Sequence, residues 1–479
     1  MSTPALHELG LVALRDLLHA REVSAREVVE DHLARIETVN PTLNAVVTLV
    51  ADRALAAADE ADRRAAGSGE LPPLHGIPMT HKDTLATRGI RTTMGSPVLA
   101  EQVPEHTDLM VQRLWDAGVI CTGKNNVPEF AAGSHTFNPV FGATGNPYDT
   151  GRSVGGSSGG AAATLAARVQ ALADGSDMGG SLRNPAAWCN VVGLRPSPGV
   201  IPMVPAPNPD ATLSRNGLMA RSVDDLALGM SVVAGPHPAG ALASPVAREA
   251  FATLLTDEGP ADLSGVRVGV SIDLGVGVPV APEVRHAVLE QAEVLASLGA
   301  TVEESAPDLR DADEVFDVTR AFDMATGLRR LVQEHLEDGL VKEDVIWNVR
   351  RGLELSAEQL MSAAEARGRL DAAVRAWFDD WDLLLTPTVQ VMPFPTEERW
   401  PREIDGVRLE TYVEWMRSCS VVSATRCPAL SVPGGFVDGL PVGLQLVGAP
   451  WSDDRLLRLA RVYERATRYA ERAPELSGG

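Results

Sequence analysis

Two glycine-rich turns that carry serines constrain this chain more than any other feature. Residues 155–160 read GGSSGG and residues 177–185 read DMGGSLRNP. Glycine adopts backbone conformations that other residues resist, so each serine is expected at the tip of a tight turn. Consecutive uncovered N–H groups in such turns can hold a negatively charged oxygen. The two turns therefore point to a site that places serine hydroxyls beside an oxyanion cradle.

These segments resemble the amidase signature family, whose members hydrolyse amides with a Ser–cis-Ser–Lys triad. Asn125 stands where the family usually has threonine. The resemblance covers roughly residues 5–470, and only about 235–270 and 310–380 look individual to this protein. Further stretches that carry the likeness are GIPMTHKD at 76–83, GKNNVPEF at 123–130, FGATGNP at 141–147, LLTPT at 384–388 and GLPVGLQ at 439–445.

The resemblance implies a catalytic role for three residues. Ser181 would be the nucleophile, Ser157 the proton relay after a cis Gly156–Ser157 bond, and Lys82 the general base. A serine hydroxyl needs a base, and a lysine is a base only when burial lowers its pKa from about 10.4. Without the resemblance, Ser181 could cap a helix, Ser157 could lie in an ordinary turn, and Lys82 could pair with Asp83.

Residues around the nucleophile receive supporting roles. Ser158, Asp177 and Arg183 are expected to fix the loops without exchanging protons, with a surface ion pair as the alternative for the last two. Ala131 and Ser176 match family positions that border the substrate. An oxyanion-hole donor is worth about 3–4 kcal/mol in the transition state. The expected donors are the backbone N–H groups of Met178, Gly179, Gly180 and Ser181.

Short apolar segments alternate with segments of helical periodicity along the chain. This rhythm predicts an α/β fold with a central mixed, mostly parallel β-sheet flanked by helices, the amidase signature fold. No linker divides the 479 residues, so we expect a single large domain over residues 1–479. Its expected parts are N-terminal helices at about 5–66, a catalytic core at about 70–235, a variable helical segment at about 310–380, and a C-terminal sheet and helix at about 381–470.

Local signals add two expectations. Ser24 and Glu27 have the spacing of a capping box, which starts a helix that Asn40-Pro41 should end. His81 precedes Lys82 in a predicted strand, Ile77–His81. Because strand side chains alternate between faces, His81 should point away from Lys82.

Composition limits the classes of binding partner that we expect for this chain. The net charge of −22 argues against nucleic acid or an anionic membrane as a direct partner. Four cysteines without a CxxC pair suggest reduced, buried thiols. No segment has the length of a membrane span or the pattern of a signal peptide, so we expect a cytoplasmic monomer or homodimer. The resemblance implies no metal or cofactor.

The expected function is hydrolysis of the C–N bond of small amides, with esters and carbamates (urethanes) as further substrate classes. Segments 125–136, 200–215 and 310–380 are expected to set substrate choice. GGSSG also fits the serine turn of an α/β-hydrolase, but no histidine follows His335 to complete that triad. Two other hypotheses stay open: the glutaminase component of a tRNA-dependent amidotransferase, and a non-catalytic binding protein on the same fold.

Overall fold

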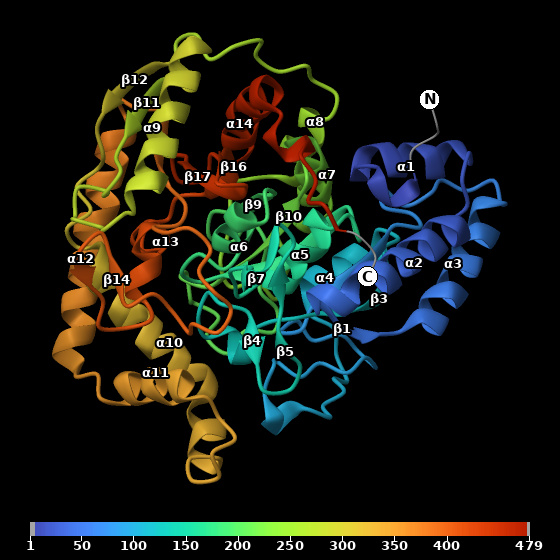
Figure 1. The fold of residues 1–479 in the computed structure, drawn as a ribbon, viewed down its shortest axis with the longest axis horizontal. Helices are drawn as coiled ribbons and strands as arrows, with labels where there is room; N and C mark the ends of the chain where they lie inside the picture. The colour runs from blue at the N-terminus through green and yellow to red at the C-terminus, as the bar shows by residue number, and fades with distance from the viewer. Residues whose placement is uncertain (1–4, 477–479) are drawn as a thin grey trace.

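Eight strands form the central sheet of the computed structural model, which describes residues 5–476 (Figure 1). Their order is β12-β11-β13-β17-β16-β9-β10-β8. The α/β fold and the mixed sheet with flanking helices are confirmed. The strands are β8 (Leu172–Asp177), β9 (Val192–Arg195), β10 (Arg215–Ala220), β11 (Arg267–Val270), β12 (Thr301–Glu304), β13 (Leu383–Pro387), β16 (Ala429–Val437) and β17 (Leu440–Val447).

The direction of the strands corrects the expectation of a mostly parallel sheet. Only the pairs β11–β12 and β11–β13 run parallel, and the other five neighbouring pairs run antiparallel. Two features cause this. β16 and β17 form a hairpin around Asp438 and Gly439, and β10 runs back between β8 and β9. Helix-linked parallel strands therefore occupy one end of the sheet.

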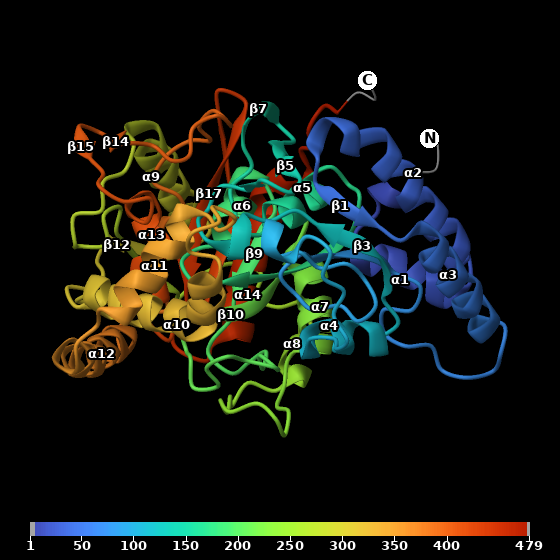
Figure 2. The ribbon, with the colours of Figure 1, turned by 90° about the horizontal axis from the view of Figure 1, so that it is seen from below.

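Helices surround the sheet and extend beyond both of its ends. In Figures 1 and 2, α1–α3 lie at one end of the molecule and α10–α12 at the other. The segment expected at about 310–380 therefore consists of three helices. The helices are α1 (Leu11–Ala20), α2 (Ala25–Leu43), α3 (Ala51–Ala65), α4 (Leu109–Asp116), α5 (Gly159–Ala166), α6 (Arg183–Trp188), α7 (Val223–Val233), α8 (Arg248–Leu254), α9 (Pro282–Ser297), α10 (Ala312–Glu334), α11 (Glu343–Leu353), α12 (Ala357–Phe378), α13 (Arg417–Ser423) and α14 (Asp453–Thr467).

A second sheet, in the order β1-β3-β2, carries Lys82. Side chains of β8 and of the segment just before it join this sheet to the central one, because Asp174 Oδ1 accepts the Lys82 N–H at 2.8 Å and Gln170 Oε1 accepts the Thr80 N–H at 2.8 Å. These bonds bring Lys82 beside β8. The remaining strands are β1 (Val46–Leu49), β2 (Pro78–Lys82), β3 (Ile120–Asn125), β4 (Phe137–Asn138), β5 (Gly142–Ala143), β6 (Gly145–Asn146), β7 (Asp149–Ser153), β14 (Glu403–Ile404) and β15 (Val407–Arg408).

The start of α2 is as predicted, but its end is not. Ser24 Oγ accepts the Glu27 N–H at 3.1 Å, and the Ser24 N–H donates to Glu27 Oε2 at 2.8 Å, which confirms the capping box. The helix runs past Pro41 to Leu43, and Asn44 closes it in the left-handed conformation. A proline in the last turn removes only one helical hydrogen bond, so it does not end the helix at once.

Small residues allow α5 to approach its neighbours closely. Every residue of α5 is buried, and a Cβ added to Gly160 would lie 2.3 Å from the Asn126 nitrogen. Such contact leaves no room for a side chain, since real Cβ atoms do not approach this closely. The close packing fixes the first turn of α5, which follows directly on Ser157 and Ser158.

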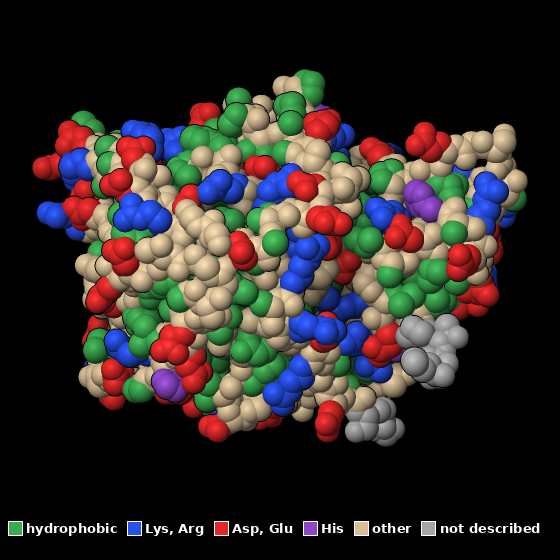
Figure 3. All heavy atoms as spheres, turned by 90° about the horizontal axis from the view of Figure 1, so that it is seen from above, with side chains coloured by type: hydrophobic (Ala, Val, Ile, Leu, Met, Phe, Trp, Pro, Cys, Tyr) green, Lys and Arg blue, Asp and Glu red, His purple; other side chains and the backbone are tan. Residues whose placement is uncertain are grey.

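The surface is mixed in charge. Acidic and basic side chains interleave on the face shown in Figure 3. Between residues 5 and 476, no helix combines the length and the apolar character needed to cross a bilayer. All four cysteines are buried and unpaired, as expected.

Candidate active site

Lys82 ends β2 with its amine fully buried. Its Nζ lies 2.8 Å from Ser157 Oγ and 3.0 Å from Ser176 Oγ. No described carboxylate lies within ion-pairing distance of this amine, and Asp83 instead accepts hydrogen bonds from the backbone and hydroxyl of Thr93. The salt-bridge alternative for Lys82 is therefore wrong. Burial lowers the pKa of Lys82 to about 7, although Asp177 and Asp174 counteract the shift.

His81 anchors the strand that delivers Lys82. Its Nδ1 lies 2.5 Å from Asp174 Oδ2, and Trp115 Nε1 donates to its Nε2 at 3.0 Å. Burial opposes the charged ring, but Asp174 raises the pKa of His81 to about 9, which favours the doubly protonated ring. An indole N–H can only donate, however, so Nε2 must accept, and we place the proton of His81 on Nδ1. No hydrogen bond joins His81 to the Lys82 amine among the described residues, in line with the expected alternation of faces.

The two serine turns contact each other through the backbone. The Ser158 N–H donates to the Ser181 carbonyl at 3.2 Å. The Gly156–Ser157 bond is cis, as the family resemblance implied. Ser158 Oγ is buried without a hydrogen-bond partner in the part of the chain that the structure describes. The hydrogen bond that joins Ser158 to the other turn therefore comes from its backbone N–H. The sequence predicted a supporting hydrogen bond for Ser158 but did not say whether its backbone or its hydroxyl would make it.

The loop after β8 leaves three backbone donors free. The Gly180 N–H donates to Asp177 Oδ1 at 2.9 Å, so it is not available to an oxyanion, and this corrects the expected set of four donors. Asp177 accepts it because the carboxylate lies at the start of the same turn. The N–H groups of Met178, Gly179 and Ser181 make no hydrogen bond to residues 5–476. Gly180 has φ +117°, a conformation that favours glycine.

Asp177 and Arg183 form a buried ion pair that holds this loop. Arg183 donates to both carboxylate oxygens, from Nη2 at 2.8 Å and from Nε at 3.0 Å. It also donates to Gln445 Oε1, and Arg195 donates to the Asp177 carbonyl. The arginines hold the pKa of Asp177 well below its usual range. Both side chains are fully buried, so the alternative of a surface ion pair is wrong.

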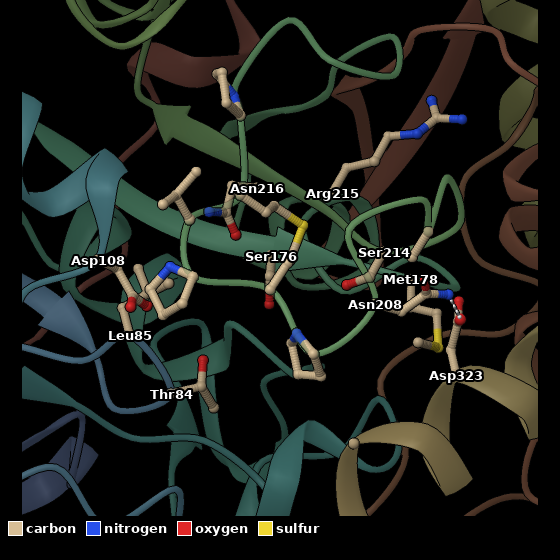
Figure 4. A pocket seen from close by; sticks show the side chains of 18 of the residues that line it. Thr84, Leu85, Asp108, Ser176, Met178, Asn208, Ser214, Arg215, Asn216 and Asp323 are labelled. Atoms are coloured by element: carbon tan, nitrogen blue, oxygen red, sulfur yellow. Dashed lines mark hydrogen bonds between the residues drawn. The ribbon is translucent and has the colours of Figure 1, made fainter. Parts of the chain in front are cut away.

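A cavity of about 470 Å³ opens beside these loops. Ala131, Ser176 and Met178 belong to its wall, and Figure 4 shows Ser176 near the centre of the view and Met178 beside Asn208. Ser181 is half-buried in the same loop. All three segments expected to set substrate choice contribute to the lining. Apolar members of the wall include Leu85, Met94, Phe130, Ile201, Met203, Met324 and Leu328.

Polar side chains also line this cavity, among them one asparagine with no partner among the described residues, one arginine and two carboxylates. Asn216 lies opposite Ser176 in the β8–β10 register, is buried, and makes no side-chain hydrogen bond to described residues. Arg215 donates four of its guanidinium N–H groups to backbone carbonyls and points away in Figure 4. Two carboxylates also line the cavity, Asp108 and Asp323. Burial raises the pKa of Asp108 to about 6 and also raises the pKa of Asp323.

Comparison with known proteins identifies the family. A model of the family described as Amidase matches residues 27–457. This chain belongs to the amidase signature family. A curated relative, a glutamyl-tRNA(Gln) amidotransferase subunit from Chloroflexus aggregans, is 35% identical, and the alignment covers 98% of this chain and 99% of the relative.

Solved structures agree with this membership. A bacterial aryl acylamidase of the amidase signature family superimposes with a TM-score of 0.90 and 27% identity, covering 98% of each chain. A 6-aminohexanoate cyclic dimer hydrolase superimposes with a TM-score of 0.85 and 29% identity, covering 98% of this chain and 99% of its own. The chain is therefore an amidase signature enzyme that acts on C–N bonds.

Sequence reasoning missed several residues that shape the site. Asn216 and Asp323 carried no motif, because their importance depends on strand register and helix packing. Lys342 could have been found from the scarcity of lysine. Its Nζ donates to the Ala132 carbonyl at 3.0 Å, and its N–H donates to Glu129 Oε2 at 3.1 Å, which attaches α11 to the loop that contains Ala131.

Proposed function

We propose that this protein is a free-standing amidase that hydrolyses small amides through a Ser181 acyl-enzyme, with Ser157 as relay and Lys82 as base. The observation that carries the proposal is the buried Lys82 amine, 2.8 Å from Ser157 Oγ and without a carboxylate partner among the described residues. A pKa lowered to about 7 leaves a substantial neutral fraction at neutral pH, and only the neutral amine accepts a proton.

The steps follow from this arrangement. Neutral Lys82 takes the Ser157 proton as Ser157 takes the Ser181 proton, and Ser181 Oγ bonds to the substrate carbonyl carbon. The negative oxygen that forms would bind the free N–H groups of the loop after β8. The C–N bond then breaks as the proton returns through Ser157 to the leaving nitrogen. Water attacks the acyl-enzyme in the same way and releases the acid.

The cavity supports small, largely apolar substrates. Its wall is mainly aliphatic, with many proline and methionine side chains, and includes the ring of Phe130. A site of this volume and composition suits an aryl or alkyl group, since apolar pockets bind by removing such surface from water. The structural likeness to an aryl acylamidase supports the same substrate class. Esters and carbamates share the carbonyl that Ser181 would attack, so we include them.

A glutaminase within a tRNA-dependent amidotransferase is the second candidate. The identity of 35% to a glutamyl-tRNA(Gln) amidotransferase component favours it. The cavity argues against it, because glutamine carries a carboxylate besides its ammonium, and that carboxylate needs a cationic partner. Arg215 is the one arginine or lysine in the described lining, and its donors are engaged with backbone carbonyls. We therefore rank the free-standing amidase first.

Purified protein without partners tests the choice. We expect turnover of 4-nitroacetanilide and its longer acyl homologues, release of 4-nitroaniline, and little release of ammonia from glutamine. The Ser181→Ala variant serves as the blank for both assays. Glutamine hydrolysis without anilide hydrolysis would favour the glutaminase, and an inactive, correctly folded protein on the whole panel would support the binding-protein hypothesis.

A further inference from the structure

We infer that the cavity selects amides that carry a cationic amine, and that Asp323 is the residue that distinguishes the charge. The inference rests on the proposed function, because it names the substrate class of the same site. Asp323 lies on α10, within the segment that looks individual to this protein, and no motif of the family includes it.

Only one of the two carboxylate oxygens of Asp323 has a hydrogen-bond partner among the described residues. Asn208 Nδ2 donates to its Oδ1 at 2.9 Å, whereas its Oδ2 is buried without a hydrogen bond from residues 5–476. Figure 4 shows Asp323 and Asn208 joined at the edge of the cavity, beside Met178. A buried acceptor without a donor costs free energy, and more so when it is charged. A ligand ammonium that reaches this edge would remove that cost.

No described cation neutralises Asp323. No lysine, arginine or histidine of residues 5–476 lies within 4.0 Å of its oxygens. Arg367 on α12 is near enough to influence its pKa, but that guanidinium donates to the Ala424 carbonyl and to Thr319 Oγ1 and does not line the cavity. The negative charge of Asp323 is therefore available to a ligand.

The second carboxylate in the cavity wall adds to the negative charge of Asp323. Asp108 accepts the Ala86 N–H at 3.0 Å and is the second carboxylate of the cavity. His106, the lining histidine, lies 3.7 Å from Asp108, and its side chain is mostly exposed to solvent. Two carboxylates within an apolar wall attract a cation and repel an anion more strongly than they would in water.

The helix sets the distance between the charge and the reaction. Phe316 of α10 packs against Gly179, since a Cβ at that glycine would lie 2.9 Å from the phenylalanine ring. Asp323 follows seven residues later on the same helix face, which corresponds to roughly 10 Å along the axis. After a hydrogen bond of about 3 Å, an extended chain of about six bonds would span the remainder.

Three amides of equal length test the inference. They are the 4-nitroanilides of heptanoate, 6-aminohexanoate and adipate, which end in a methyl, an ammonium and a carboxylate. At pH 8 we expect kcat/KM of the ammonium substrate to exceed that of the carboxylate substrate by at least about 30-fold. Asp323→Asn should reduce this ratio at least tenfold. Asp317→Asn, which changes an exposed carboxylate on the same helix that pairs with Arg351 and does not line the cavity, should keep it.

Each outcome decides one point. An unchanged ratio in Asp323→Asn, or an equal loss in Asp317→Asn, would overturn the inference. If wild type hydrolyses none of the three anilides, the proposed function fails, and calorimetry with 1-hexylamine and hexanoate still tests the cavity. Tighter binding of the amine in wild type, lost in Asp323→Asn, would then support the charge selection, and equal binding would reject it.

Discussion

The floor of the candidate site and the wall of its cavity are built in opposite ways. On the floor, Lys82, Asp174, Asp177 and Arg183 are fully buried, and hydrogen bonds from neighbouring elements hold each of them. In the wall, apolar side chains dominate, and polar groups such as Asn216 lack partners among the described residues. The floor is thus fixed for one chemistry, whereas the wall leaves groups free to contact a substrate.

The largest expected effect is that of removing the proposed nucleophile. Ser181→Ala should reduce kcat by at least about 10³-fold, because no group remains to form the acyl-enzyme. A fluorophosphonate probe followed by peptide mass spectrometry should label Ser181 in the wild type. A label on Ser157 or Ser158 would contradict the assignment, and an unchanged far-UV spectrum of the variant serves as the folding control.

The next largest effect concerns the protonation of Lys82. Its folded pKa of about 7 lies below the usual value, so the neutral base increases as pH rises through 7. Wild-type kcat/KM should therefore increase from pH 6 and level off above about pH 8. Lys82→Arg keeps the charge but stays protonated, so it should be as inactive as Lys82→Ala at every pH. A flat wild-type profile with an active arginine variant would rule out a lysine base.

The ion pair below the loop should matter less to chemistry and more to stability. Asp177→Asn leaves Arg183 buried beside a neutral amide, so unfolding free energy should fall by about 3–5 kcal/mol. The Gly180 turn would also loosen, and kcat should fall about 10- to 100-fold with little change in KM. Asp313→Asn, which removes a partly exposed partner of Arg417, is the control and should alter neither quantity much. Equal destabilisation by both variants would contradict the distinction between the buried and the partly exposed ion pair.

The smallest expected effect is that of a substitution in the cavity wall. Leu328→Ala enlarges the cavity, so KM for an aryl amide should rise about three- to tenfold while kcat stays close to wild type. Leu336→Ala, an exposed leucine further along the same part of the chain, should have no effect. A large fall in kcat for Leu328→Ala would show that the wall also orients the reacting groups.

The comparison of floor and wall also explains what the sequence could reveal. The family resemblance pointed to the two serine turns and to Lys82, which the structure places 2.8 Å from Ser157 Oγ. Away from the site, the capping-box spacing predicted the helix start at Ser24. The role of the Gly180 N–H was not, because it depends on where the Asp177 carboxylate points. Strands β9 and β10 were also missed, since each is short and buried on both faces and therefore shows no alternation.

The three lysines have one further consequence. Lys82 and Lys124 are fully buried, and Lys342 is largely buried with its amine 2.8 Å from Asp344. Lys124 donates to the Leu85 carbonyl and to Thr87 Oγ1. The folded chain therefore offers an acylating reagent little access to its lysine amines, since only the Lys342 side chain is partly exposed. Covalent tagging of lysine would report unfolding of this protein, and an enzyme that forms activated acyl groups would leave its own lysines largely unmodified.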